Sequence, residues 1–195
     1  MSKKIKEFAG NFYPDQYKKD SKLDINHNYL LEQFADHDEI LNKIKQVVIR
    51  GDFTLGSIVD EVEEEYAKLC GTKHAIGVGS GTDALFLSLK SIGVDKGDEV
   101  ITTPFTFFAT VGAIVTSGAT PVFVDCGDDL NINADLIESA ITPRTKAIMP
   151  VHWSGRPCEM DSINAIAEKH GIYVIEDACH AIQATYKNRP AGSLG

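Results

Sequence analysis

The sequence has little positive charge and no long hydrophobic run, and each shortage argues against a class of protein. Its 195 residues carry 19 Lys+Arg against 28 Asp+Glu, a formal net charge of −9. This balance disfavours a nucleic-acid binder that relies on a basic face. No stretch approaches the ~18 apolar residues of a membrane span, and the N-terminal segment 1–8 lacks the apolar part of a secretory signal. We expect a soluble, cytoplasmic protein that binds neither nucleic acid nor membrane.

Cysteine is also scarce. The four cysteines, Cys70, Cys126, Cys158 and Cys179, form no Cys-x-x-Cys pair. This spacing indicates neither a zinc knuckle nor a thioredoxin-type redox site. We therefore expect no metal site, and we expect the cysteines to be buried, reduced thiols of a cytosolic protein.

The residues that are abundant point to one folded domain. An apolar fraction of 43% argues against disorder, and 195 residues suffice to bury a sizeable core. Residues 1–35 have no clear hydrophobic period and are expected to form an N-terminal arm. Residues 36–195 are expected to form the domain.

From residue 36 onward, helical and strand patterns alternate. The short strand runs are rich in Val and Ile, as is typical of strands buried on both faces. Strand and helix in alternation predict an α/β fold with a mostly parallel sheet flanked by helices. The expected helices are 36–49, 57–70, 83–92, 106–117, 134–141 and 160–170, and the expected strands are 100–103, 120–125, 146–151 and 173–176, preceded by an apolar run at 74–78.

Three local features accompany these helices. Asp36 and Glu39 have the spacing of a capping box at the start of helix 36–49. Gly71 is expected to end helix 57–70. Helix 83–92 is apolar almost all round, which predicts that it is buried.

Ligands of such sheets bind at the carboxyl ends of the strands. Polar groups follow each strand run at that edge, and their convergence predicts a site for a small molecule. These groups are Gly79–Thr82, Thr103–Thr106, Asp125, His152 and Asp177.

The turn Gly77–Thr82 suits a phosphate, because small residues let backbone N–H groups at a helix N-terminus approach the anion. Thr82 stands where a dinucleotide site needs glycine, and no Gly-Lys-Ser/Thr triplet of a nucleoside-triphosphate loop follows Gly81. A single phosphate with one hydroxyl contact from Thr82 fits better. Close packing of helix and strand is the alternative explanation of this turn.

Two further groups of residues each allow a functional and a structural interpretation. Asp177 at a strand end can hold a positively charged ring nitrogen, with His180 pointing the same way, or it can cap a following helix while His180 is a core histidine. Phe105, Phe107 and Phe108 can belong to the core or cover the face of a planar ring.

Together these motifs form an ordered series. It resembles the sugar-nucleotide aminotransferases of the DegT/DnrJ/EryC1/StrS group, which depend on pyridoxal 5′-phosphate (PLP) and have the aspartate aminotransferase (type I) fold. The resemblance runs from about residue 25 to Gly195. The motifs are Gly79–Leu85, Thr103–Thr110, Pro121–Asp125, Met149–His152 and Glu176–Ala181, preceded by Gly51–Gly56.

The resemblance implies a role for each position. The turn at Gly81, Thr82 and Asp83 would hold the cofactor phosphate. Phe107 would stack on the pyridine ring. Asp177 would pair with the ring nitrogen, and His180 would lie near the ring hydroxyl.

One part of the family pattern is missing. The family's Schiff-base lysine lies a few tens of residues beyond the acid, so we expect it beyond Gly195 and expect no catalytic residue within this chain. Lys187, the one lysine after Asp177, lies in an expected hairpin turn and comes too early. We therefore expect 36–195 to be the PLP-binding large domain, truncated before that lysine and without the small C-terminal domain.

The function that the resemblance implies is amination of a nucleotide-linked keto sugar, with an amino acid, glutamate by expectation, as donor. Relatives are homodimers with active sites at the subunit boundary, so a homodimer is expected. Two alternatives stay open at this stage. One is a PLP- or pyridoxamine-phosphate-dependent sugar-nucleotide dehydratase of the same family, and the other is an inactive cofactor-binding fragment.

Overall fold

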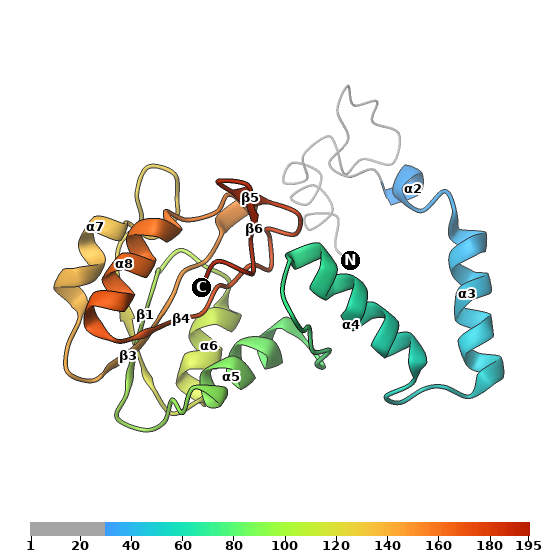
Figure 1. Cartoon of the computed structure of the whole chain (residues 1–195), viewed down its shortest axis with the longest axis horizontal. Coiled ribbons are helices and arrows are strands. Elements are labelled where there is room, and N and C mark those ends of the chain that lie inside the picture. Colours follow the sequence, from blue (N-terminus) through green and yellow to red (C-terminus); the bar gives the residue numbers. More distant parts are fainter. Residues whose placement is uncertain (1–29) are drawn as a thin grey trace, which may run out of the picture. The chain divides into compact units, whose positions relative to one another are not determined.

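The computed structural model describes residues 30–195 (Figure 1). The chain divides into two compact units, residues 1–54 and 55–195, and each is described by itself. The expected arm lies outside the described residues as far as residue 29, and its boundary at 35/36 stays a prediction.

The described part of the first unit consists of α2 (Leu30–Gln33) and α3 (His37–Arg50). Helix α3 confirms the expected helix and ends at Gly51, whose φ of 70° is left-handed. The expected capping box is wrong. The Asp36 side chain accepts no capping hydrogen bond, and the Glu39 carboxylate instead pairs with Lys43 at 2.9 Å, one helical turn further on.

The second unit holds a parallel sheet and a short hairpin. Its helices are α4 (Ser57–Cys70), α5 (Gly81–Ser91), α6 (Phe108–Thr116), α7 (Ala134–Ile137) and α8 (Met160–His170), with 3₁₀ turns η2 (Glu138–Ala140) and η3 (Trp153–Gly155). Its strands are β1 (Glu99–Thr102), β2 (Thr120–Phe123), β3 (Thr145–Met149), β4 (Tyr173–Val174), β5 (Thr185–Tyr186) and β6 (Arg189–Pro190).

The strand order is β2-β1-β3-β4, and every neighbouring pair in this sheet is parallel. Strands β5 and β6 form the expected antiparallel hairpin, with Lys187 and Asn188 at its turn. Both central residues of that turn have positive φ, which matches the twist of the flanking strands. The mostly parallel α/β fold is therefore confirmed.

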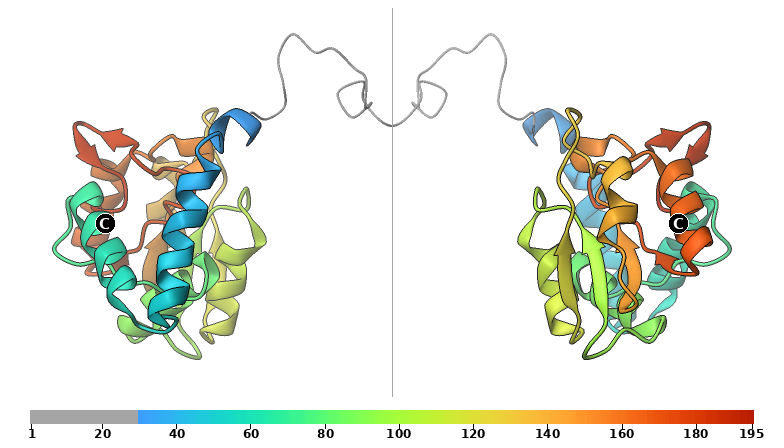
Figure 2. Two further views of the ribbon diagram at one scale, coloured as in Figure 1. Left: turned by 90° about the vertical axis from the view of Figure 1, so that its right-hand side faces the viewer. Right: turned by 90° about the vertical axis from the view of Figure 1, so that its left-hand side faces the viewer.

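Each face of the sheet has its own hydrophobic core, because successive side chains of a strand point to opposite faces. Ile101 and Ile148 join the core beneath α7 and α8. Val100 and Ala147 join the core beneath α5 and α6. In Figure 2 the strands lie between α6 (yellow-green) and α8 (orange). Burial of each isoleucine stabilises the fold by roughly 1.5–3 kcal/mol, so the two cores hold the carboxyl edge of the sheet rigidly in place.

The apolar run at 74–78 does not form the expected strand. Ile76 is 81% exposed and Val78 is also exposed. Within residues 30–195 no strand pairs with this segment, and Gly77 N–H instead donates to the Glu63 carboxylate at 2.6 Å. An apolar run becomes a strand only where a neighbouring strand accepts its backbone hydrogen bonds.

Three other expectations overestimated the burial of an element or its length. Helix α5 buries only the face of Leu85 and Leu89, while Leu87 is 47% exposed. Strand β2 is an edge strand and is not buried on both faces, since Phe123 is exposed. Strand β4 ends at Val174, although the chain continues alongside β3 to Asp177.

None of the helices within residues 30–195 is both long and apolar enough to span a membrane.

Candidate functional site

A cavity of about 250 Å³ lies where the carboxyl ends of the strands meet. It draws residues from the start of α5, from the β1–α6 connection and the first turn of α6, and from the segments that follow β3 and β4. The lining residues are Gly81, Thr82, Leu85, Thr106, Phe107, Ala109, Thr110, Val151, Trp153, Asp177, Cys179 and His180. Five of the six expected cofactor-binding residues, all except Asp83, thus share one cavity.

The N-terminus of α5 presents free donors to this cavity. The Ser80 hydroxyl accepts a hydrogen bond from the Asp83 N–H at 3.1 Å and donates one to the Asp83 carboxylate at 3.0 Å. The N–H groups of Gly81 and Thr82 have no partner within the described residues. Unpaired N–H groups at the positive end of a helix form an anion site. Ser80 is thus the N-cap of α5, and the Asp83 carboxylate turns toward the Ser80 hydroxyl and orients it.

Asp177 places a buried carboxylate in the same cavity. Its backbone follows β4 and is fixed beside β3, because Asp177 N–H donates to Pro150 O at 2.9 Å and Asp177 O accepts from His152 N–H at 3.1 Å. The residue is buried, with 5% of its surface exposed. Its Oδ2 accepts a hydrogen bond from the Thr110 hydroxyl at 2.7 Å. No helix follows Asp177 in the structure, so the interpretation of Asp177 as a helix cap is wrong.

Cys179 lies against this carboxylate. Burial, and secondly the Asp177 carboxylate, raise the pKa of the Cys179 thiol to about 11. The thiol is therefore protonated at neutral pH and adds no second negative charge beside Asp177. All four cysteines are free, but Cys158 alone among them is buried as a whole residue, so the expectation of buried thiols is wrong for Cys70, Cys126 and Cys179.

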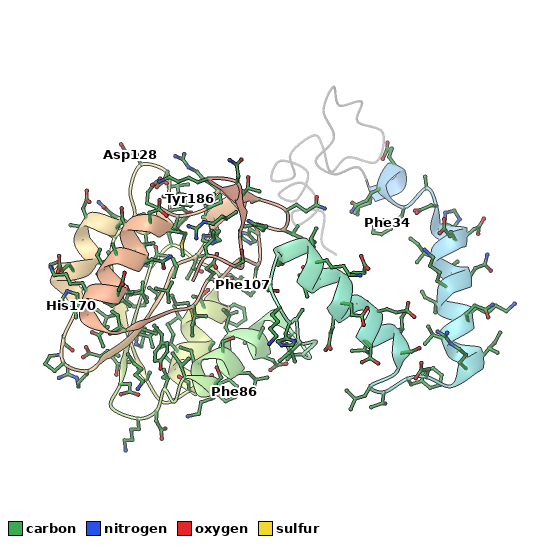
Figure 3. The ribbon with its side chains drawn as sticks, in the orientation of Figure 1. Phe34, Phe86, Phe107, Asp128, His170 and Tyr186 are labelled. Carbon is green, nitrogen blue, oxygen red and sulfur yellow. The ribbon has the colours of Figure 1, made fainter. Side chains whose placement is uncertain are left out.

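Aromatic side chains form part of the cavity wall. The Trp153 ring centroid lies 4.5 Å from that of Phe105 and 5.1 Å from that of His180. Phe107, which directly precedes α6, is 59% exposed, and its ring centroid lies 4.4 Å from that of Phe108. Figure 3 labels Phe107. Because Phe105, Phe107, Phe108 and His180 are all exposed, the interpretation of these residues as core is wrong.

The loop that carries Trp153 is held by a buried asparagine. The Asn131 side-chain oxygen accepts from Trp153 N–H at 3.0 Å, and its NH₂ donates to Arg156 O at 3.1 Å. Ser154, inside the turn, has a φ of 52°, a left-handed conformation that such anchoring helps to maintain.

Two of the strand-end groups expected at the site lie elsewhere. His152 is fully buried outside the cavity. Its Nδ1 accepts from Cys158 N–H at 3.2 Å, so the proton is on Nε2, which donates to Glu176 at 2.8 Å. Asp125 is exposed and accepts from its neighbour, Cys126 N–H, at 2.8 Å. Both are satisfied locally and do not face the cavity.

Sequence reasoning gave no site role to the apolar lining residues Leu85, Ala109 and Val151, nor to Thr110, Trp153 and Cys179. Thr110 lies in α6, four residues after Thr106, which precedes the helix, and the two hydroxyls are 2.7 Å apart. Trp153, the one tryptophan of the sequence, follows His152 directly at the end of β3. Cys179 was considered only as a buried thiol. The positions of Thr110 and Trp153 in the sequence could have indicated a site role, but their contacts could not be predicted from it.

Comparison with known proteins agrees with the geometry. The model of the DegT/DnrJ/EryC1/StrS aminotransferase family matches residues 35–195. The spore coat polysaccharide biosynthesis protein SpsC of Bacillus subtilis (strain 168) is 48% identical over 158 residues, which are 80% of this chain and 41% of SpsC.

Solved structures show the same likeness. DesV of S. venezuelae, in complex with a ketimine intermediate, superposes with a TM-score of 0.81 at 40% identity, covering 84% of this chain and 44% of DesV. NtdA of Bacillus subtilis with bound cofactor PMP gives 0.78 at 35% identity, covering 87% and 40%. DesI with its TDP-sugar product gives 0.77 at 36% identity, covering 82% and 41%. The chain thus spans less than half the length of these relatives.

Proposed function

We propose, from the fact that this chain belongs to the DegT/DnrJ/EryC1/StrS aminotransferase family, that it provides the cofactor-binding part of a sugar aminotransferase. The cofactor of the family is PLP, which becomes pyridoxamine 5′-phosphate (PMP) in its amine form, and NtdA is a relative solved with PMP.

The observation that carries the proposal is the pairing of opposite electrostatic features in one cavity. The N–H groups of Gly81 and Thr82 suit a phosphate, and the buried Asp177 carboxylate suits a cationic ring nitrogen. A phosphorylated pyridinium has both features on one small molecule. The donor set of the cavity therefore fits PLP.

Each cavity residue has a role in this proposal. Gly81 and Thr82 bind the phosphate, with the Thr82 hydroxyl as an additional donor, while Asp83 acts through the helix cap. Phe107 covers one face of the ring, and His180 lies near the ring hydroxyl. Asp177 holds a proton on the ring nitrogen. When bound, the cofactor supplies an electron sink for negative charge that develops on the substrate carbon.

No lysine within residues 30–195 lines the cavity. Lys187 occupies the β5–β6 turn, where its ammonium pairs with Asp161 at 2.5 Å. The described residues therefore bind and orient the cofactor, but they include no lysine placed to carry a proton to and from the substrate.

For the whole protein we propose a nucleotide-linked keto sugar as substrate and an amino acid, glutamate, as amino donor. The support is the TDP-sugar product in DesI and the spore coat polysaccharide biosynthesis for which SpsC is named. We further propose a homodimer in the cytoplasm. Exposed apolar side chains around the site, including Phe107 and Phe108, offer surface for a subunit boundary.

The test is calorimetric titration of the 195-residue chain with PMP and with pyridoxamine, which lacks the phosphate. PMP should bind and pyridoxamine should bind at least tenfold more weakly. Asp177→Asn should weaken PMP binding by about tenfold or more, since a neutral amide no longer favours the charged ring nitrogen. The matched control is Asp125→Asn, another acid that follows a strand but lies outside the cavity. Equal affinities for both ligands, or equal losses in both variants, would contradict the proposal.

A further inference from the structure

Two threonine hydroxyls lie in line behind the Asp177 carboxylate. Thr106 Oγ1 is 2.7 Å from Thr110 Oγ1, and Thr110 Oγ1 is 2.7 Å from Asp177 Oδ2. Thr110 is fully buried, whereas Thr106 is half-buried. Both threonines also line the cavity. The three side chains come from segments 67 residues apart in the sequence, so only the folded chain brings them together.

The direction of these hydrogen bonds follows from elementary chemistry. An ionised carboxylate can only accept, and a threonine hydroxyl has one proton to donate. Thr110 therefore gives its proton to Asp177 and can only accept from Thr106. Thr106 thus donates to Thr110, and the three groups form a directed chain that ends on Asp177.

We propose that Thr110 and Thr106 are positioning residues that order Asp177 for the cofactor ring nitrogen. This inference rests on the proposed function. With Oδ2 held by Thr110, the carboxylate cannot rotate freely. Its Oδ1 accepts a long hydrogen bond of 3.4 Å from Cys179 N–H and keeps the capacity to accept a second one from the ring N–H. Held in this way, the carboxylate oxygen Oδ1 is oriented to accept a hydrogen bond from the protonated ring nitrogen.

Fold geometry makes this arrangement stiff. Thr110 belongs to the first turn of α6, and its N–H donates to Phe107 O at 3.2 Å. Asp177 is fixed through its backbone to the segment that follows β3. The chain of hydroxyls therefore connects two rigid elements, α6 and the sheet edge.

The experiment uses the full chain and PMP labelled with ¹⁵N at the ring nitrogen. Thr110→Val keeps the side-chain shape and removes the hydroxyl, whereas Thr110→Ser keeps the hydroxyl. Thr110→Val should weaken PMP binding by about tenfold, and its ¹⁵N signal should show the ring nitrogen losing its proton at lower pH than in the parent. Thr110→Ser should resemble the parent, and Thr106→Val should give a smaller effect in the same direction. Thr116→Val is the control, because that exposed hydroxyl in α6 donates to its own helix at Gly112 O.

The outcomes separate the two proposals. If Asp177→Asn shifts the ¹⁵N titration and Thr110→Val does not, the positioning role is wrong and the proposed function stands. If PMP does not bind the parent, or Asp177→Asn leaves the titration unchanged, the proposed function itself is wrong. If Thr110→Val does not fold, the half-buried Thr106→Val decides: a titration identical to that of the parent would overturn the inference.

Discussion

Glu176, next to Asp177, is the residue whose replacement should destabilise the site most clearly. Its carboxylate accepts hydrogen bonds from His152 Nε2 at 2.8 Å and from the N–H groups of Gly192, Leu194 and Gly195 at 2.9, 2.5 and 2.8 Å. In Glu176→Gln one oxygen becomes an NH₂ group, so the two donors at that position face a group that cannot accept. Hydrogen bonds to charged groups contribute roughly 1.5–3 kcal/mol each. We expect the free energy of unfolding to fall by about 3 kcal/mol and the Tm to fall by roughly 10 °C.

The pH dependence makes this prediction specific. Burial raises the pKa of Glu176, but the hydrogen bonds from His152 and the three backbone N–H groups outweigh it and hold the pKa below the ordinary 4.5. A folded-state pKa below the unfolded value means that the carboxylate stabilises the fold above 4.5. That contribution is lost as the pH falls through the folded-state pKa.

Urea unfolding of the parent and of Glu176→Gln should therefore show a large difference at about pH 7 and a smaller one at about pH 3. Glu61→Gln, on the exposed face of α4, is the control and should change stability by less than about 0.5 kcal/mol at both pH values. A difference between parent and Glu176→Gln that is equal at both pH values would refute the reasoning, because the carboxylate would then not be the stabilising group.

Three further predictions concern single residues. Gln183 has a φ of 61° and is exposed, so Gln183→Gly should stabilise the fold by about 0.5 kcal/mol in urea unfolding, and a loss of stability would contradict the assigned backbone strain. Because the pKa of the Cys179 thiol is raised to about 11, its alkylation rate should keep rising up to that pH and should increase at neutral pH in Asp177→Asn; a rate that levels off near pH 8 would be inconsistent with this environment. Ile148 is fully buried in the core beneath α8, and Ile148→Ala should cost about 3 kcal/mol of unfolding free energy, whereas a cost below about 1 kcal/mol would mean that the core is loosely packed.

Residues whose structure depends on local pattern were predictable. Helices α3, α4 and α8 follow from apolar residues at helical spacing, and the αL ends at Gly51, Gly71 and Gly171 follow from glycine at the end of each pattern. The buried strands β1 and β3 follow from their continuous Val and Ile runs. The segment 74–78 has the same composition, but strand formation needs a partner that composition does not report.

Some residues of the candidate site could likewise be predicted from the sequence, and others could not. Asp177 could be found because it stands at the end of an apolar run, where an α/β sheet gathers its ligands. Gly81 could be found because small residues open a helix there, although the run before it forms no strand. His152 also follows a strand, yet its side chain points into the interior toward Glu176, and only the folded backbone decides which way a side chain beyond a strand turns. The contact of Thr110 with Asp177 spans 67 residues and cannot be read from spacing.

A crystal structure of this chain soaked with PMP tests the central claim most directly. The account predicts that the ring nitrogen lies within about 3 Å of the Asp177 carboxylate. It also predicts that the phosphate accepts hydrogen bonds from the N–H groups of Gly81 and Thr82. A phosphate bound away from the N-terminus of α5, or a ring nitrogen that faces no carboxylate, would contradict it.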